Sequence, residues 1–547
     1  MVKKDSLIKG TIILAAAALV ARVLGLFQRI PLDYMMGSSG GVYFGIANSL
    51  YLLLLLVATG GIPSAISKMV SERYALGKPR EAQRIYGAAL RFGMLAGVIM
   101  ALLMFLLAPL YAEYISKEEN ADLSIMAIAP ALLLFPLIAM MRGYFQGRQM
   151  MAAGGISQII EQIARVLTAV GLALIVLNLG WGDRWIAAAA TFGSVFGSIG
   201  AFAVMVYYAR KLRRQDAAEP PVSKEIPGAA SALPYRSIYR EMFSISVPIV
   251  VAAITVQFMY NFDTNLFHML TDSFYGGKDA AREALDWLAI RAQSLAGIPP
   301  ILAIALSTSI IPVISAAFSV RNMDEVERQT SLVMRIVVFT GVPAALTLTV
   351  AAVSVTGFFF EGTGGSGLVA ALTAGTIFQI TMMTSNSVLF GMGKARIPMR
   401  HTIIGLVVKV IGSLALAPLL GAYGLIIAST LCFIAISTLN LRAVGREVSH
   451  TVLGSRWGGY LVTIVASAGA GYAVDLLARS ALDGLPAKVT YFFAAAATGI
   501  AALAVYAVLL VLLRVIRPEE VKQFPGPLRK LLGPLMRLAP KRAASRD

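Results

Sequence analysis

The sequence predicts an all-α polytopic membrane protein with about 14 transmembrane helices, arranged as two six-helix lobes related by pseudo-two-fold symmetry plus two C-terminal helices. Of the 547 residues, 58% are hydrophobic and 14% charged, and the mean hydropathy is +0.75, values far from those of a soluble globular protein. Apolar runs of about 20 residues, each long enough to cross a bilayer as a helix, alternate with charged loops. These observations set the fold class.

The expected organisation follows the chain from one apolar run to the next. We divide it into an N-terminal lobe (1–210), a cytoplasmic linker (211–239), a C-terminal lobe (240–446), two further spans (447–516) and a basic cytoplasmic tail (517–547). The predicted spans lie near 8–30, 40–66, 88–113, 121–146, 155–180, 184–210, 240–270, 294–320, 332–359, 366–391, 399–422, 424–446, 456–480 and 488–516.

The first span carries two arginines in its apolar run, Arg22 and Arg29. An arginine at the centre of a span costs at least about 2.5–3.5 kcal/mol, so it normally faces water, a partner or a substrate. Seven residues are nearly two helical turns, which puts both side chains on one face and makes them candidates for a pathway lining. The alternative for Arg29 is that it snorkels to the interface. Because the run continues past Ala21, we expect an uncleaved helix rather than a signal peptide.

Three polar segments lie between or after the apolar runs. Ser67 to Gly87 is predicted to form a short helix on the cytoplasmic face. Lys211 to Pro234 has the Pro-Pro pair and mixed charges of a flexible linker. The tail from Arg514 to Asp547 is basic and Pro-rich, which favours contact with anionic membrane lipids.

The distribution of basic residues predicts the orientation. Of the 47 lysines and arginines, 36 lie in alternate loops and at the termini, leaving four inside spans and seven in the opposite loops. Those seven are Lys117, Arg184, Lys278, Arg282, Arg291, Arg479 and Lys488. This is the positive-inside pattern, so we expect a plasma (cytoplasmic) membrane protein with both termini in the cytoplasm. It also explains the net charge of +18 without a nucleic acid partner.

A weak internal repeat predicts two homologous halves. The segment around Ile62-Pro63 recurs at Ile311-Pro312, 249 residues later, and Gly147 matches Gly393 at an offset of 246. Because six spans is an even number, the halves share an orientation and are related by an axis along the membrane normal. Such folds bind substrate between the halves.

The fifth span contains a polar stripe at helical spacing, formed by Gln158, Glu161, Gln162 and Arg165. Residues at i, i+3, i+4 and i+7 lie on one face, so Glu161 and Arg165 can pair. The stripe either lines a transport pathway or is an ion pair that joins helices.

The seventh span carries a second polar stripe, made of Gln257, Asn261, Thr264, Asn265 and His268. Asp263 projects roughly 120° away from this stripe and therefore needs different partners. A carboxylate inside a span can bind a cation or proton, or be solvated near a helix end. Lys409 is a lone intramembrane cation in the eleventh span. Its partner is Asp263, Glu161 or an anionic substrate.

The sequence lacks the residues that several functional classes require. One cysteine, Cys432, and three histidines leave little for disulfides or a Cys/His metal site, so no metal is expected. Neither Gly276-Gly277-Lys278-Asp279 nor Gly391-Met392-Gly393-Lys394-Ala395 completes a phosphate-binding loop. We therefore expect a transporter rather than an enzyme, with no cofactor and with the coupling ion left open.

Longer motifs suggest a family. They are Lys9-Gly10-Thr11 and Arg22-Val-Leu-Gly25, Gly61-Ile-Pro63-Ser-Ala-Ile-Ser-Lys68, Arg142-Gly143-Tyr-Phe-Gln-Gly147-Arg148, and Ser157-Gln158-Ile-Ile-Glu161-Gln162. Over essentially its whole length the chain resembles the polysaccharide transporters of the MOP (MATE-like) superfamily, especially the Bacillus-type group of the lipid II flippase MurJ and stage V sporulation protein B. The resemblance implies a central cationic cavity between two lobes, with Arg22 receiving a pyrophosphate. The second span lacks the arginine of Gram-negative flippases, so Lys409 and Arg165 are the candidates to complete the cavity.

The resemblance implies a flippase that moves an undecaprenyl-pyrophosphate-linked oligosaccharide, with lipid II the leading candidate, to the outer leaflet by alternating access. The expected partners are this substrate and membrane lipids, and the expected state is a monomer. Two alternatives remain: a multidrug/cation antiporter of the MATE type, and a membrane enzyme acting on a lipid-linked sugar. Fold alone does not choose among them.

Overall fold

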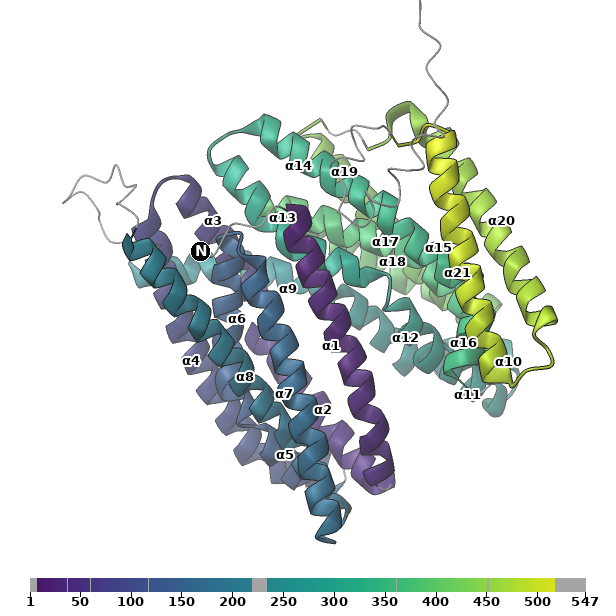
Figure 1. Cartoon of the computed structure of the whole chain (residues 1–547), viewed down its shortest axis with the longest axis horizontal. Coiled ribbons are helices and arrows are strands. Elements are labelled where there is room, and N and C mark those ends of the chain that lie inside the picture. Colours follow the sequence, from purple (N-terminus) through teal and green to yellow (C-terminus); the bar gives the residue numbers. More distant parts are fainter. Residues whose placement is uncertain are drawn as a thin grey trace, which may run out of the picture. The chain divides into compact units, whose positions relative to one another are not determined.

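The computed structural model describes residues 7–36, 38–59, 61–116, 118–218, 234–360, 362–449 and 452–516. Every regular element within these ranges is a helix, as Figure 1 shows, so the all-α prediction is confirmed. The chain separates into two compact units. Unit 1 comprises Met1–Ala253, Thr308–Asn322 and Gly391–Gly393, and unit 2 the remaining segments.

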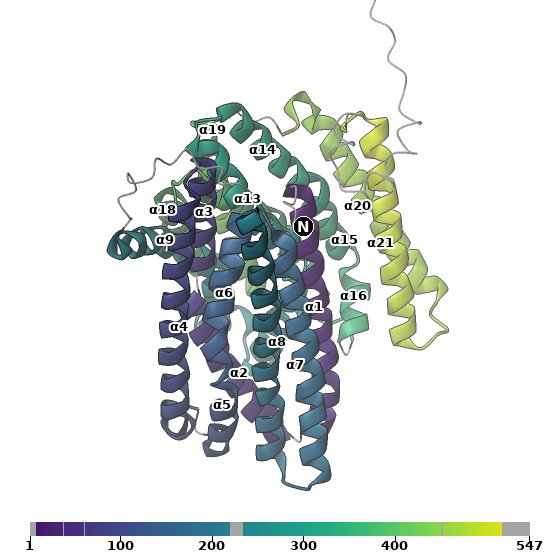
Figure 2. The ribbon, with the colours of Figure 1, turned by 60° about the vertical axis from the view of Figure 1, so that its left-hand side comes forward.

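Unit 1 is a bundle of long helices with two shorter ones, α3 and α5. They are α1 (Leu7–Met35), α2 (Ser38–Thr59), α3 (Ile62–Ala75), α4 (Pro79–Leu110), α5 (Asp122–Ile128), α6 (Ala131–Gly147), α7 (Met151–Asn178) and α8 (Asp183–Ala218). In Figure 2, α1 and α8 flank α7 and α4 lies near α6, in agreement with the contacts between these helices. Apolar clusters around Ile66 and Phe145, and around Tyr51 and Met104, fill the interior.

Two helices contribute several residues to each unit, and α17 (Ser366–Gly391) contributes its last residue, Gly391, to unit 1. α9 (Tyr235–Asn265) passes from unit 1 to unit 2 after Ala253, and α13 (Pro300–Ser319) passes from unit 2 to unit 1 after Ser307. The boundary of the compact units therefore does not coincide with the linker in the sequence.

Unit 2 contains the other helices, several of them short. They are α10 (Phe267–Tyr275), α11 (Lys278–Asp286), α12 (Gln293–Ala296), α14 (Met323–Ile336), α15 (Val342–Val350), α16 (Ala352–Phe359), α17 (Ser366–Gly391), α18 (Arg396–Leu420), α19 (Ala422–Gly445), α20 (Trp457–Ala481) and α21 (Ala487–Leu512). The pairs α18/α19 and α20/α21 are helical hairpins, and α16 packs against α21.

The number of helices agrees with about 14 spans. Within the described residues, 10 helices are long and apolar enough to cross a membrane, or 11 if the bent pair Glu119–Ile128 and Ala131–Gly147 is one span. α1, α2 and α13 lie where the other three spans are predicted. The protein is therefore a multi-pass helical membrane protein.

The structure corrects the predicted boundary between the second and third spans. The span predicted near 40–66 ends at Thr59, and α3 begins at Ile62 after Gly61, whose φ is 69°. A side chain at Gly61 would be strained by this left-handed backbone, and its Cβ would lie 2.6 Å from the Ser246 carbonyl oxygen. The polar helix predicted over 67–87 is divided, because α4 already begins at Pro79.

Other predicted spans are interrupted. The span near 240–270 breaks at Leu266 between α9 and α10, and the span near 332–359 consists of α14, a π-helical turn, α15 and α16. Hydrophobic periodicity does not reveal such breaks because the apolar run continues through them. The predicted linker is narrower than 211–239, since α8 extends to Ala218 and α9 starts at Tyr235. Its centre and the tail (517–547) lie outside the described residues.

Two glycines of the Arg142–Arg148 motif bring α6 against α3. A Cβ added at Gly143 would lie 2.6 Å from the Pro63 carbonyl oxygen, and one at Gly147 would lie 2.7 Å from the Ser67 carbonyl oxygen. Arg148 follows in the turn and binds both oxygens of Asp216, at 2.6 and 2.9 Å. Burial lowers the pKa of Arg148, but this hydrogen bonding raises it above its ordinary value, so the guanidinium stays charged.

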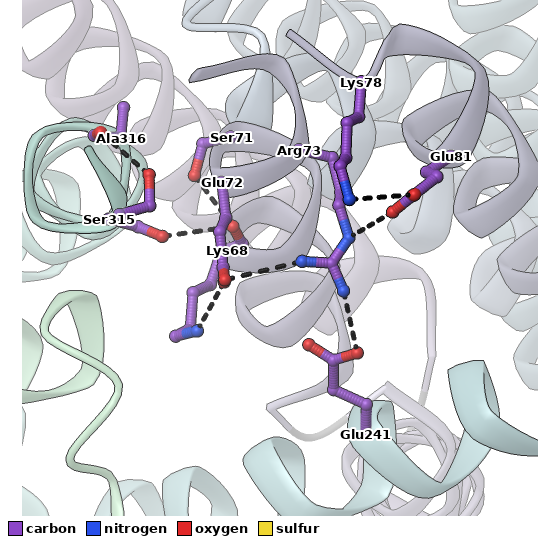
Figure 3. A network of polar contacts seen from close by, with 10 residues as sticks. Lys68, Ser71, Glu72, Arg73, Lys78, Glu81, Glu241, Ser315 and Ala316 are labelled. Carbon is purple, nitrogen blue, oxygen red and sulfur yellow. Dashed lines mark hydrogen bonds and ion pairs between the residues drawn. The ribbon is translucent and has the colours of Figure 1, made fainter. Parts of the chain in front are cut away.

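An ion network joins α3 to its neighbours in unit 1, as Figure 3 shows. The Arg73 guanidinium lies 3.4 Å from Glu72, 3.0 Å from Glu81 in α4 and 3.3 Å from Glu241 in α9. The Lys68 carbonyl oxygen accepts a hydrogen bond of 3.2 Å from Ser315 in α13. Arg73 therefore balances carboxylates from three helices.

Replacing Arg73 with glutamine is expected to lower the free energy of unfolding by about 1–3 kcal/mol, because three partly buried carboxylates lose their shared cation. Thermal unfolding of the purified protein measures the loss. Lys78→Gln is the matched control, since Lys78 is half exposed and, among the described residues, pairs with Glu81 alone. We expect a change within about 0.5 kcal/mol. Equal losses in both variants would contradict the shared role of Arg73.

Candidate functional site

A buried cluster of two arginines and one glutamate lies inside unit 1. Glu161 in α7 accepts hydrogen bonds from Arg142 of α6 at 2.9 Å and from Arg165 at 3.0 Å. The Glu161 side chain is 6% exposed, and those of Arg142 and Arg165 are 13% and 19% exposed. Two guanidinium groups share one carboxylate, so the cluster carries a net positive charge.

Close helix packing holds this cluster in place. A Cβ at Gly197 in α8 would lie 2.9 Å from the Glu161 carbonyl oxygen and 3.1 Å from the Arg165 Cβ, so the glycine lets α8 approach α7. On α6, Arg142 also donates to Ser157 at 2.7 Å. Each charged side chain is therefore fixed by a neighbouring helix.

Two polar atoms of the cluster have no hydrogen-bond partner among the described residues: Arg165 Nε and the hydroxyl of Tyr51 in α2. Tyr51 is 2% exposed, and its hydroxyl lies close to Arg165, so these two groups also interact with each other. Buried donors are normally satisfied, so such atoms often mark a place for a ligand or water. An anion would satisfy both.

Unit 2 contains a second buried charge pair. Lys409 Nζ in α18 donates to Asp263 Oδ1 at 2.5 Å and to the Leu425 carbonyl oxygen at 2.9 Å. The Lys409 side chain is fully buried, and the Asp263 side chain is 4% exposed. Of the three partners that the sequence leaves open for Lys409, the structure places Asp263 beside it.

The polar stripe of the seventh span lies on another side of α9. Gln257 and Asn261 are exposed, whereas Asp263 is buried, as the 120° separation predicts. The side chain of Asn265 lies outside the described part of the structure. The same holds for Arg22 and Arg29: their backbone forms part of α1, but their side chains are not described.

Sequence reasoning missed two buried charged residues. Arg142 falls inside the span predicted near 121–146 and about as far before the 148–150 turn as Ser157 lies after it. An antiparallel pair of helices joined by a short turn brings such positions together. Asp475 in α20 is buried and accepts hydrogen bonds from Arg479 at 2.9 Å and Ser354 at 2.5 Å. Its i,i+4 spacing to Arg479 was the available signal.

The described residues contain no group of three or more His, Cys, Asp or Glu side chains that could hold a metal ion. The candidate functional residues are the arginine–glutamate cluster inside unit 1 and, separately, the lysine–aspartate pair inside unit 2. Charges that are buried inside membrane helices and held by neighbouring helices are typical of membrane transporters.

Comparison with known proteins agrees with this class. Residues 7–318 match the family described as polysaccharide biosynthesis protein, and the chain belongs to this family. It is 27% identical over 490 residues to the lipid II flippase MurJ of Bacillus subtilis (strain 168), covering 86% of this chain and 88% of that one. It is also 23% identical over 525 residues to stage V sporulation protein B of the same organism, covering 95% and 98% of the two chains.

A solved structure supports the fold. The outward-facing structure of a multidrug resistance MATE family transporter of the MOP superfamily is similar with a TM-score of 0.66, over 81% of this chain and 96% of that one. The identity is 13%, so the likeness concerns the fold. The predicted resemblance to the group of MurJ and stage V sporulation protein B is confirmed by the family match and these two relatives, and the solved structure supports the predicted fold.

Proposed function

We propose that the protein is a flippase that moves an undecaprenyl-pyrophosphate-linked oligosaccharide, most directly lipid II, from the inner to the outer leaflet by alternating access. The observation that carries the proposal is the 27% identity along 88% of a lipid II flippase. In this proposal the protein is a transporter in the plasma membrane, it acts as a monomer and both termini are cytoplasmic.

The buried charges fit an anionic headgroup. Bare pyrophosphate in hydrocarbon is prohibitively costly, so its path needs cations and hydrogen-bond donors. The unit 1 cluster offers a net positive charge together with the unsatisfied Arg165 Nε and Tyr51 hydroxyl. We assign Arg165 and Arg22 as anion-binding residues, while the polyprenyl tail stays in lipid. Gln257 and Asn261 would offer hydrogen bonds to sugars.

A cation antiporter is the second candidate, favoured by the fold shared with a multidrug transporter. Binding an organic cation requires a carboxylate without a cationic partner. In the part of the chain that the structure describes, Glu161 and Asp263 are each paired with a cation of the protein itself. This pairing favours the anionic substrate.

The test is replacement of the essential lipid II flippase in a conditional strain. We expect the wild-type chain to restore growth, and Arg22→Ala or Arg165→Gln to restore it poorly at matched expression, because each removes a cation from the path. Arg142 keeps Glu161 paired in Arg165→Gln, so this variant should still fold.

Arg214→Gln, which changes an exposed arginine of α8, is the matched control and should restore growth like the wild type. A well-expressed wild-type chain that fails to restore growth would remove lipid II as the substrate and favour another lipid-linked glycan. Full rescue by both variants would keep the function but remove these arginines from the mechanism.

A further inference from the structure

The surroundings of Lys409 in unit 2 are those of a bound cation. Its ammonium group contacts the Asp263 carboxylate at 2.5 Å and the Leu425 carbonyl oxygen at 2.9 Å. It also lies 5.8 Å from the centroid of the Phe262 ring, within the range of a cation–π contact. These groups come from α9 and α19, whereas the lysine extends from α18.

A serine completes the arrangement of oxygen atoms. Ser429 Oγ donates to Asp263 Oδ2 at 3.4 Å and to the Leu425 carbonyl oxygen at 3.0 Å. The carboxylate and the carbonyl thus contact the ammonium group directly, and the hydroxyl lies beside both groups. Hard monovalent and divalent cations are bound in proteins by these same oxygen groups.

A carboxylate this deeply buried needs a positive partner. In a membrane protein the partner is either an ion taken from solution or a charge that belongs to the chain. Here the chain supplies it, and the Lys409 side chain is fully buried.

We propose that Lys409 is a tethered cation that fills a latent site for a monovalent cation between α9, α18 and α19, so that this part of the protein takes no ion from solution. What this inference says about the coupling of ions to transport rests on the proposed transport function. The buried charge of unit 2 then remains constant through the cycle, and any ion coupling must involve other residues.

Removal of the ammonium group tests the proposal directly. We would purify the full chain in detergent and measure its melting temperature in sodium chloride and in choline chloride at matched ionic strength. The wild type should melt at the same temperature in both salts. Lys409→Ala should melt lower than the wild type in choline and recover part of the loss in sodium, with an apparent sodium affinity at least about tenfold above that of the wild type.

Two matched variants separate the site from general salt effects. Lys409→Ala/Asp263→Ala removes the carboxylate as well and should not respond to sodium. Lys394→Ala removes a partly exposed lysine that pairs with Glu447 in the same unit, and it should behave like the wild type.

Sodium stabilisation of the wild type, or a folded Lys409→Ala protein that responds equally to both salts, would overturn the proposal. If Lys409→Ala is recovered in neither salt, Lys409→Asn supplies an additional oxygen ligand and should be recovered in sodium alone. Failure of both variants in sodium would also overturn it. Because no lipid-linked substrate takes part, these results stand apart from the outcome of the complementation test.

Discussion

Replacing Glu161 with alanine is expected to destabilise the protein by about 3–5 kcal/mol, because it leaves two largely buried guanidinium groups without an anion. Arg142 and Arg165 both donate to this carboxylate, and their side chains are 13% and 19% exposed. Neither can release its proton, since arginine stays charged in proteins. The loss should appear as a large drop in the thermal unfolding midpoint and in the yield of folded protein.

Two further variants show whether the loss comes from the unpaired cations. Glu161→Ala/Arg142→Met should regain part of the stability, because it leaves one cation without its carboxylate, Arg165, rather than two. Glu119→Ala, which removes an exposed glutamate, should change the free energy of unfolding by less than about 0.5 kcal/mol. A loss in Glu161→Ala no larger than that of this control would mean that the cluster does not hold α6 against α7.

The pairing inside α7 was predictable from sequence because it is local. Glu161 and Arg165 are four residues apart, and such residues are neighbours on any helix. The same periodicity separated Asp263 from the Gln257 and Asn261 face of α9, and burial in the structure follows this division. Helical periodicity therefore gave the direction of each side chain.

Partners on other helices were not predictable in the same way. Periodicity leaves three partners open for Lys409, because the choice depends on which helices pack together. Arg142 was missed because its partners, Ser157 and Glu161, lie on the next helix. The break at Gly61 was missed because an apolar run can continue through a change of direction, while the left-handed φ of 69° is a property of the folded backbone.

Asp475 and Arg479 form an i,i+4 ion pair, and the burial of Asp475 makes this pair more important for stability than one at the surface. Its side chain is 1% exposed and accepts hydrogen bonds from Arg479, from Ser354 in α16 and from Thr498 in α21. The carboxylate thus joins α16, α20 and α21 at one point. At the surface the loss of such a pair would cost only tenths of a kcal/mol, whereas removing one partner of a buried charge pair costs about 3–5 kcal/mol.

Asp475→Ala is therefore expected to cost about 3 kcal/mol, the loss of charge-assisted hydrogen bonds that join three helices. Asp475→Asn keeps the shape and an acceptor oxygen, so it should cost less than alanine. The measurement is thermal unfolding of the purified variants, with Asp483→Ala, at an exposed position after α20, as the matched control. If asparagine costs as much as alanine, the negative charge of Asp475 stabilises the junction. If neither variant differs from the control, other contacts hold α16 against the α20/α21 hairpin. Lys488 makes such contacts, because its ammonium group donates to the Gly357 and Phe358 carbonyl oxygens at 3.1 and 2.9 Å.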